Sequence, residues 1–178
     1  MTRGQTQYQV RFDWGFTGLQ AISDGADVVI WVDVLGTGTD EPIESEVPVL
    51  RASLRNRRAI AERVLAQQGD KGERFMVAIV AAGERWDDGS PRFAVEDLLA
   101  AGAIIDALAD LGIDYCSPEA AAASAAFTGL RNATGHLIGA SASGRTLAAA
   151  GRRAEIDAAI ELDISSEVAG VGEFDPLL

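Results

Sequence analysis

Two runs of β-branched and aliphatic residues constrain the fold of this chain more than any other feature. They cover residues 27–34 and 75–82. Such runs are typical of strands that are buried on both faces, as in parallel sheets covered by helices. Each run is followed by a glycine-containing loop and then by a segment with helical periodicity. This alternation predicts an α/β fold, with a mainly parallel sheet and helices packed on its faces.

The rest of the chain supplies further elements of the same fold. Residues 8–13 alternate between apolar and polar side chains, which predicts a half-buried strand. Residues 156–162 fit a strand or a helix, and a strand is favoured. Apolar spacing and capping signals predict helices over residues 16–23, 50–67, 93–111, 118–127 and 143–150. Loops are expected at residues 36–48, which we expect to be mobile, and at 83–91, with an irregular tail over 167–178.

Length and charge limit the class of protein. With 178 residues, the chain is expected to form one α/β domain over residues 1–178. Its 27 acidic residues against 15 basic ones give a net charge of −12, which repels nucleic acid and anionic lipid surfaces. The apolar runs are far shorter than the roughly 20 residues that cross a bilayer, and the first residues lack the apolar stretch of a secretory signal. We therefore expect a cytoplasmic protein that binds neither nucleic acid nor membrane.

The cysteine and histidine content narrows the possible chemistry. Cys116 is the single cysteine, so an intrachain disulfide is excluded, and we interpret this thiol as inert. Since His136 is the single histidine, zinc sites built from Cys and His are nearly excluded, and no nucleophile-elbow pattern lies near it. Any chemistry is therefore expected to use carboxylates, hydroxyls and arginines.

Carboxylates lie where the predicted fold would place a ligand. Asp33 ends the first buried run, Gly83 follows the second, and Glu96 and Asp97 lie in the first turn of the next predicted helix. Ligands of open α/β sheets gather outside the carboxyl ends of the strands. Asp33, Glu96 and Asp97 are thus candidate oxygen ligands for Mg²⁺. The alternative is that the helix dipole alone favours acidic residues in a first turn, and that Asp33 merely caps a loop.

Two features are candidate contacts for phosphate. The loop Gly36-Thr37-Gly38-Thr39 offers amides and hydroxyls, although it matches neither a Walker loop nor a dinucleotide fingerprint. Arginines gather in the next segment, and they form either a solvated helix face or a cluster that recruits an anionic ligand. These arginines are at positions 51, 55, 57, 58 and 63.

Several short segments, taken in their order along the chain, resemble the Mg²⁺-dependent 2-phosphosulfolactate phosphatases, in particular those of actinobacterial type. The matching segments are residues 8–15, 32–35 (Val-Asp-Val-Leu), 54–56 (Leu-Arg-Asn), 82–86 (Ala-Gly-Glu-Arg-Trp), 88–90, 95–99, 101–102, 117–120, 143–145 with Leu147, and 162–168.

The resemblance implies a Mg²⁺-dependent hydrolase that removes phosphate from a small sulfonated acid. Between Leu35 and Leu50 the family has several dozen more residues, including a turn that handles phosphate, whereas this chain has 14 residues there. The fold is thus expected to be shortened and the turnover weakened. The implied catalytic and metal-binding residues are Asp33, Glu96 and Asp97, and the implied substrate-binding residues are Thr39, Arg55, Asn56, Gly83 and Arg85.

Three functions remain open from the sequence. The first is a Mg²⁺-dependent phosphatase acting on a small anionic phosphorylated substrate, such as a sulfonate or hydroxy acid. The second is a shortened relative without turnover that binds a ligand or serves in assembly. The third, a generic acidic α/β subunit, fits the composition but not the ordered matches. Because loss of central elements would uncover a sheet edge or an apolar face, we also expect a homodimer or larger assembly.

Overall fold

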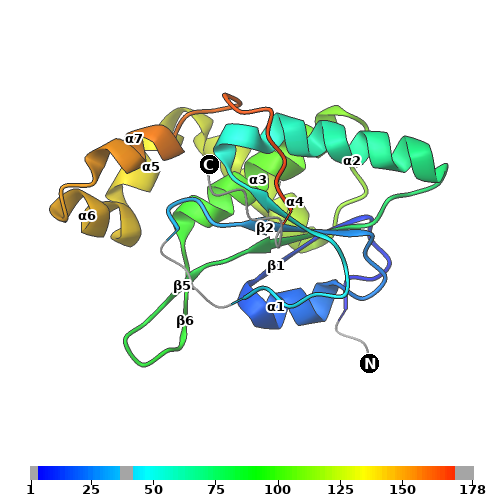
Figure 1. Ribbon diagram of the computed structural model, residues 1–178, viewed down its shortest axis with the longest axis horizontal. Coiled ribbons are helices and arrows are strands. Elements are labelled where there is room, and N and C mark those ends of the chain that lie inside the picture. The colour runs from blue at the N-terminus through cyan, green and yellow to red at the C-terminus, as the bar shows by residue number, and fades with distance from the viewer. Residues whose placement is uncertain (1–3, 37–41, 171–178) are drawn as a thin grey trace.

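The computed structural model describes residues 4–36 and 42–170, and a four-stranded parallel sheet forms its centre (Figure 1). The strands lie in the order β1-β4-β2-β3. β2 and β4 are the two predicted buried strands, and they pair directly, with Ile30 opposite Ile79. The predicted α/β fold with a mainly parallel sheet is therefore confirmed. The strands are β1 (Val10–Trp14), β2 (Val28–Val32), β3 (Val49–Ala52) and β4 (Val77–Ala81).

Helices cover both faces of this sheet (Figure 1). α1 (Gly15–Ile22) packs on one face, where Leu19 lies in a cluster with Val29 and Val80. The opposite face contributes to the larger core, which also contains apolar residues of the three longest helices. No helix within residues 4–36 and 42–170 could span a bilayer. The three longest helices are α2 (Arg57–Lys71), α3 (Val95–Asp110) and α4 (Pro118–Leu130).

Short elements complete the fold. Three short helices lie together beyond one end of the sheet, and a hairpin of two short strands projects from the body (Figure 1). The 118–127 and 143–150 helices are confirmed, and Ser117 caps the first of them, its hydroxyl accepting from the amide of Ala120. The short elements are η1 (Leu54–Asn56), η2 (Arg131–Ala133), α5 (Thr134–Ala140), α6 (Ala142–Ala149), α7 (Arg153–Ala159), β5 (Glu84–Arg85) and β6 (Pro91–Arg92).

The predicted helix over residues 50–67 was wrong at its start. Residues 49–52 form β3, which pairs in parallel with β2. Leu50 and Leu54 are four residues apart, so their spacing resembled one helical face, but a capping box at Ser53 separates the strand from the helical turns. The helix also continues past Gly69 to Lys71, and Gly72 closes it at a φ of 72°.

The strand favoured for residues 156–162 was also wrong, because α7 occupies most of that segment. Ile156 and Ala159, which are three residues apart, face the core, while Asp157 pairs with Arg153 across one turn at 3.1 Å. In the same way, the predicted loop over residues 83–91 contains the β5–β6 hairpin. α5 was not predicted at all.

Two predicted irregular segments fall partly outside the described residues. Of the 36–48 loop, positions 37–41 lie outside them, so its expected mobility stays a prediction; residues 42–48 contain no helix or strand. Of the 167–178 tail, positions 171–178 lie outside, and residues 167–170 are irregular apart from a bridge between Gly170 and Leu50.

Segments of the same chain lie along both outer strands of the sheet. Gly170 bridges to Leu50 on β3, and Cys116 bridges to Val10 on β1. An exposed sheet edge therefore supplies little reason for assembly, since edges that are already paired do not need a partner chain. The predicted homodimer or larger assembly stays a prediction.

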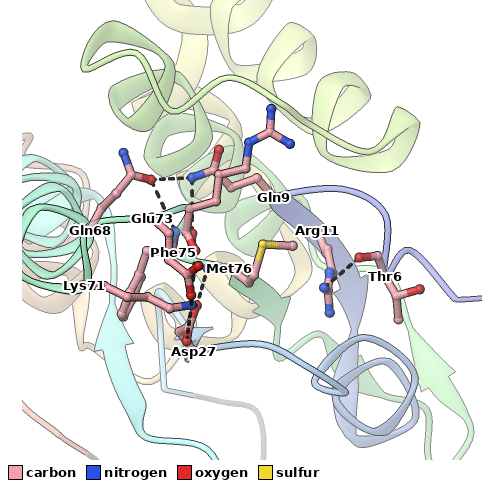
Figure 2. A network of polar contacts seen from close by, with 10 residues as sticks. Thr6, Gln9, Arg11, Asp27, Gln68, Lys71, Glu73, Phe75 and Met76 are labelled. Carbon is pink, nitrogen blue, oxygen red and sulfur yellow. Dashed lines mark hydrogen bonds and ion pairs between the residues drawn. The ribbon is translucent and has the colours of Figure 1, made fainter.

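A polar network fixes the amino end of the sheet (Figure 2). Asp27 accepts from the amide of Met76 at 2.7 Å and pairs with Lys71 at 2.8 Å, which joins the entries of β2 and β4 to the end of α2. Nearby, the guanidinium of Arg11 is buried and donates to four backbone carbonyls, including that of Thr6. These hydrogen bonds satisfy the buried guanidinium of Arg11. Its burial can therefore be explained without a bound ligand.

Gly102 permits the close packing of α3 on α4. A Cβ at this position would lie 2.1 Å from the carbonyl oxygen of Ala123. Because the obstacle is helix backbone, we expect Gly102→Ala to lower the free energy of unfolding by about 3 kcal/mol, despite its gain in helix propensity. Gly129→Ala in α4 is the matched control, since its Cβ would meet nothing within 4 Å. Urea unfolding of both variants checks the prediction, and equal stabilities would contradict it.

Candidate active site

A small pocket opens at the carboxyl ends of the central strands. Its volume is about 130 Å³, and its wall consists of residues 14–17, Trp31, residues 82–85 and residues 91–92. The pocket thus lies between the amino end of α1, the end of β4 and the base of the hairpin. Trp14, the residue before α1, makes no side-chain capping bond to the helix. The free N–H groups of a first helical turn favour an anion.

Asp97 joins the ends of the two central strands. Its side chain is 2% exposed, and its two carboxylate oxygens accept from the amides of Val34 and Gly83, each at 2.9 Å. Burial raises the pKa of Asp97 well above its ordinary value, and the charges of Asp33 and Glu96 raise it further, against the lowering effect of the two amide bonds. The sequence identified this residue as a candidate, but the bonds that it makes show that it also holds the loops after β2 and β4.

Asp33 lies beside this carboxylate, directly after β2. Its Oδ1 accepts from the amide of Gly36 at 2.9 Å, so it closes a tight turn as well as facing Asp97. Gly83, another predicted site residue, adopts a φ of 69°, and a Cβ there would lie 3.2 Å from the carbonyl of Arg92. Glycine at 83 therefore permits the hairpin base to approach β4 closely.

Glu96 contacts helix α6. The residue is 3% exposed, and its carboxylate accepts from the hydroxyl of Ser143, which also contacts the carboxylate of Glu84. Sequence reasoning assigned no role to Glu84 or Ser143. Both lie in segments that carry the family resemblance, but a contact between residues 59 positions apart has no local signal.

Arginines form one wall of the pocket. Arg92 pairs with Glu84 at 3.2 Å, and its guanidinium lies 4.4 Å from the centre of the Trp86 ring. Arg85 lines the same pocket and donates to the carbonyl of Gly89 at 3.2 Å. Arg85 was predicted and Arg92 was not. The short antiparallel pairing in the hairpin brings both to the pocket.

The remaining predicted residues lie elsewhere. Arg55 and Asn56 line a second pocket of about 320 Å³, at the end of β3, which shares no lining residue with the first. The side chain of Asn56 accepts from the amide of Ser53 and donates to the carbonyls of Arg51 and Glu167. Its amide is thus occupied in holding the chain together. Thr39 lies outside the described residues.

The residues beside the first pocket suit a hard cation only in part. Among residues 4–36 and 42–170, no three His, Cys, Asp or Glu side chains are arranged to hold a metal ion. The donors present are carboxylate and hydroxyl oxygens, the ligands that Mg²⁺ prefers, and this ion takes one or two protein carboxylates and completes its shell with water. The donor chemistry therefore fits Mg²⁺ bound with several waters.

Comparison with known protein families and curated proteins bears on this site. No curated protein sequence matches the chain. A family model described as 2-phosphosulpholactate phosphatase matches residues 29–173, which include β2, β3, β4, the hairpin and the helices from α2 to α7. The match covers well over half of the chain, and it includes Asp33, Glu84, Glu96 and Asp97. The chain therefore belongs to the 2-phosphosulpholactate phosphatase family.

Proposed function

We propose that the chain is a Mg²⁺-dependent phosphatase that acts on a small phosphorylated sulfonate or hydroxy acid, resembling 2-phosphosulfolactate. The observation that carries this proposal is the contact between two parts of the site. Glu84 lines the arginine-walled pocket. The hydroxyl of Ser143 contacts both Glu84 and Glu96, and Glu96 is the residue before Asp97. An arginine-walled pocket and a pair of acidic residues thus adjoin, an arrangement that suits metal-assisted phosphate hydrolysis.

Each group has a role in this proposal. Arg85 and Arg92 neutralise the phosphoryl oxygens, with the N–H groups at the start of α1. Mg²⁺, when bound, would be held by Asp33 and Glu96 and would supply positive charge and an activated water. Asp97 fixes the two loops that carry this arrangement. The oxygen of water bonds to phosphorus, the ester P–O bond breaks, and the proton of water passes to the departing alcohol.

The pocket wall favours a small anionic substrate. Its volume of about 130 Å³ offers room for a phosphoryl group and the atoms next to it. The aromatic side chains of Trp14, Phe16 and Trp31 in the wall favour a short carbon skeleton between the anionic groups. This is consistent with the small substrates that the family name implies.

Phosphate release from a panel of small phosphomonoesters, with Mg²⁺ and with a chelator, tests the proposal. We expect release only with Mg²⁺, and at rates below about 1 s⁻¹, because the phosphate-handling turn that the resemblance implies is missing. Absence of release from every ester by the folded protein would reject the phosphatase.

A binding function without turnover is the second candidate. It is favoured by one observation: Asp97 and Asn56, both predicted as site residues, use their polar atoms in bonds to backbone groups of the chain. Binding of an ester without its hydrolysis, measured by calorimetry, would support this candidate over the first.

Glu96 provides a test of the metal that does not depend on turnover. Glu96→Gln is expected to weaken Mg²⁺ binding at least about tenfold in a calorimetric titration, because a charged oxygen ligand is lost. Glu119→Gln is the matched control, since Glu119 lies in the first turn of α4 and is exposed. Identical traces for wild type and Glu96→Gln would reject the metal site, and an equal loss in both variants would indicate an effect of helix dipoles alone.

A further inference from the structure

We propose that Ser143 is a positioning residue of this site, which holds the arginine wall of the pocket in a fixed relation to Glu96. The role of Ser143 in catalysis rests on the proposed function. Its position between the two carboxylates follows from the contacts described above. Ser143 lies in α6, far along the chain from the pocket, and its side chain is 2% exposed.

The first step is the contact of one hydroxyl with two carboxylates. The Oγ of Ser143 lies within hydrogen-bonding distance of Glu84 and of Glu96. The hydroxyl has a single proton and donates it to one carboxylate at a time. Through this shared contact it links the hairpin base to the first turn of α3.

The second step leads from Glu84 to the pocket. Glu84 pairs with Arg92 at 3.2 Å, and Arg92 lines the pocket and stacks on Trp86. The hairpin that carries these residues has only two residues in each strand. A hairpin of this size is not stable by itself, so the position of Arg92 depends on what holds Glu84.

The third step concerns how α6 is placed. Gly144 packs against α5 so closely that a Cβ there would lie 2.2 Å from the carbonyl oxygen of Ile138. Ser141 caps α6, its hydroxyl accepting from the amide of Gly144 at 3.0 Å. Ser143 is therefore presented to the two carboxylates by a rigidly packed turn, as a positioning group must be.

Hydrogen exchange of the hairpin amides tests the inference without reference to activity. The amides of Trp86 and Gly89, which donate within the hairpin, are expected to exchange about tenfold faster in Ser143→Ala. Glu84→Gln, which leaves Ser143 in place, is expected to have the same effect. Thr146→Ala removes an exposed hydroxyl from the same helix, and it is expected to leave these amides unchanged.

Turnover supplies the second readout. If Ser143 positions Arg92, the effects of Ser143→Ala and Arg92→Gln on kcat/KM are less than additive, whereas those of Thr146→Ala and Arg92→Gln add. Unchanged hairpin exchange in Ser143→Ala would overturn the inference, as would equal exchange in Ser143→Ala and Thr146→Ala. Faster exchange in a protein that releases no phosphate would instead leave the positioning intact and reject the phosphatase.

Discussion

Asp97→Ala is expected to lower the free energy of unfolding by roughly 2–4 kcal/mol, a large share of the total for a chain of this size. The reason is that the amides of Val34 and Gly83 both lose their acceptor, Gly83 being buried. Relief of the repulsion from Asp33 and Glu96 offsets only part of this cost. Urea unfolding in the presence of a chelator measures the change.

Asp110→Ala is the control for this prediction. Asp110 ends the same helix and is exposed, so the same chemical change there removes no buried bond. We expect its effect to stay within about 0.5 kcal/mol. A comparable loss of stability in both variants would show that Asp97 does not join the strand ends.

The raised pKa of Asp97 also gives a pH dependence with a definite sign. The carboxyl group of Asp97 binds its proton more tightly in the folded protein than in the unfolded chain. Its contribution to the free energy of unfolding is therefore most favourable below the unfolded pKa of about 3.9. It declines as pH rises from there to the folded pKa, which lies well above the ordinary value. In Asp97→Asn this decline is expected to vanish. A variant with the same pH profile as wild type would show that Asp97 does not titrate in this way.

Arg92→Gln is expected to lower kcat/KM for a small phosphomonoester by about 10²–10³-fold, because one preorganised donor to the phosphoryl oxygens is lost. The ion pair with Glu84 and the stacking on Trp86 hold this guanidinium at the pocket wall. Arg63→Gln, an exposed change on α2, removes the same charge at a distance from the pocket. Equal activities of the two variants would remove Arg92 from the site.

The sequence predicted the parts of the fold that have a continuous local signal. The buried runs became β2 and β4, and the predicted helix over residues 93–111 became α3. It failed where a short element depends on its neighbour in space. β3 has four residues and is a strand because it pairs with β2, while α7 is defined by which of its residues reach the core.

The candidate site divides in the same way. Asp33, Glu96 and Asp97 were found because the ends of strands and the starts of helices converge in an α/β fold. The roles of Asp97 and Ser143 were not predictable, because each depends on a partner from a distant segment. The partner of Asp97 is an amide 63 positions away, and that of Ser143 is a carboxylate 59 positions away. Only the packing of α3 and α6 brings these groups into contact.

The aromatic wall of the first pocket has a practical consequence. The chain has three tryptophans. Trp14 and Trp31 line the pocket, and Trp86 contacts Arg92, which lines it too. The tryptophan emission of this protein therefore arises entirely from indoles in or beside one cavity. An anion that enters the pocket and displaces water or the Arg92 guanidinium alters their surroundings, so unlabelled protein reports its own occupancy in a simple fluorescence titration.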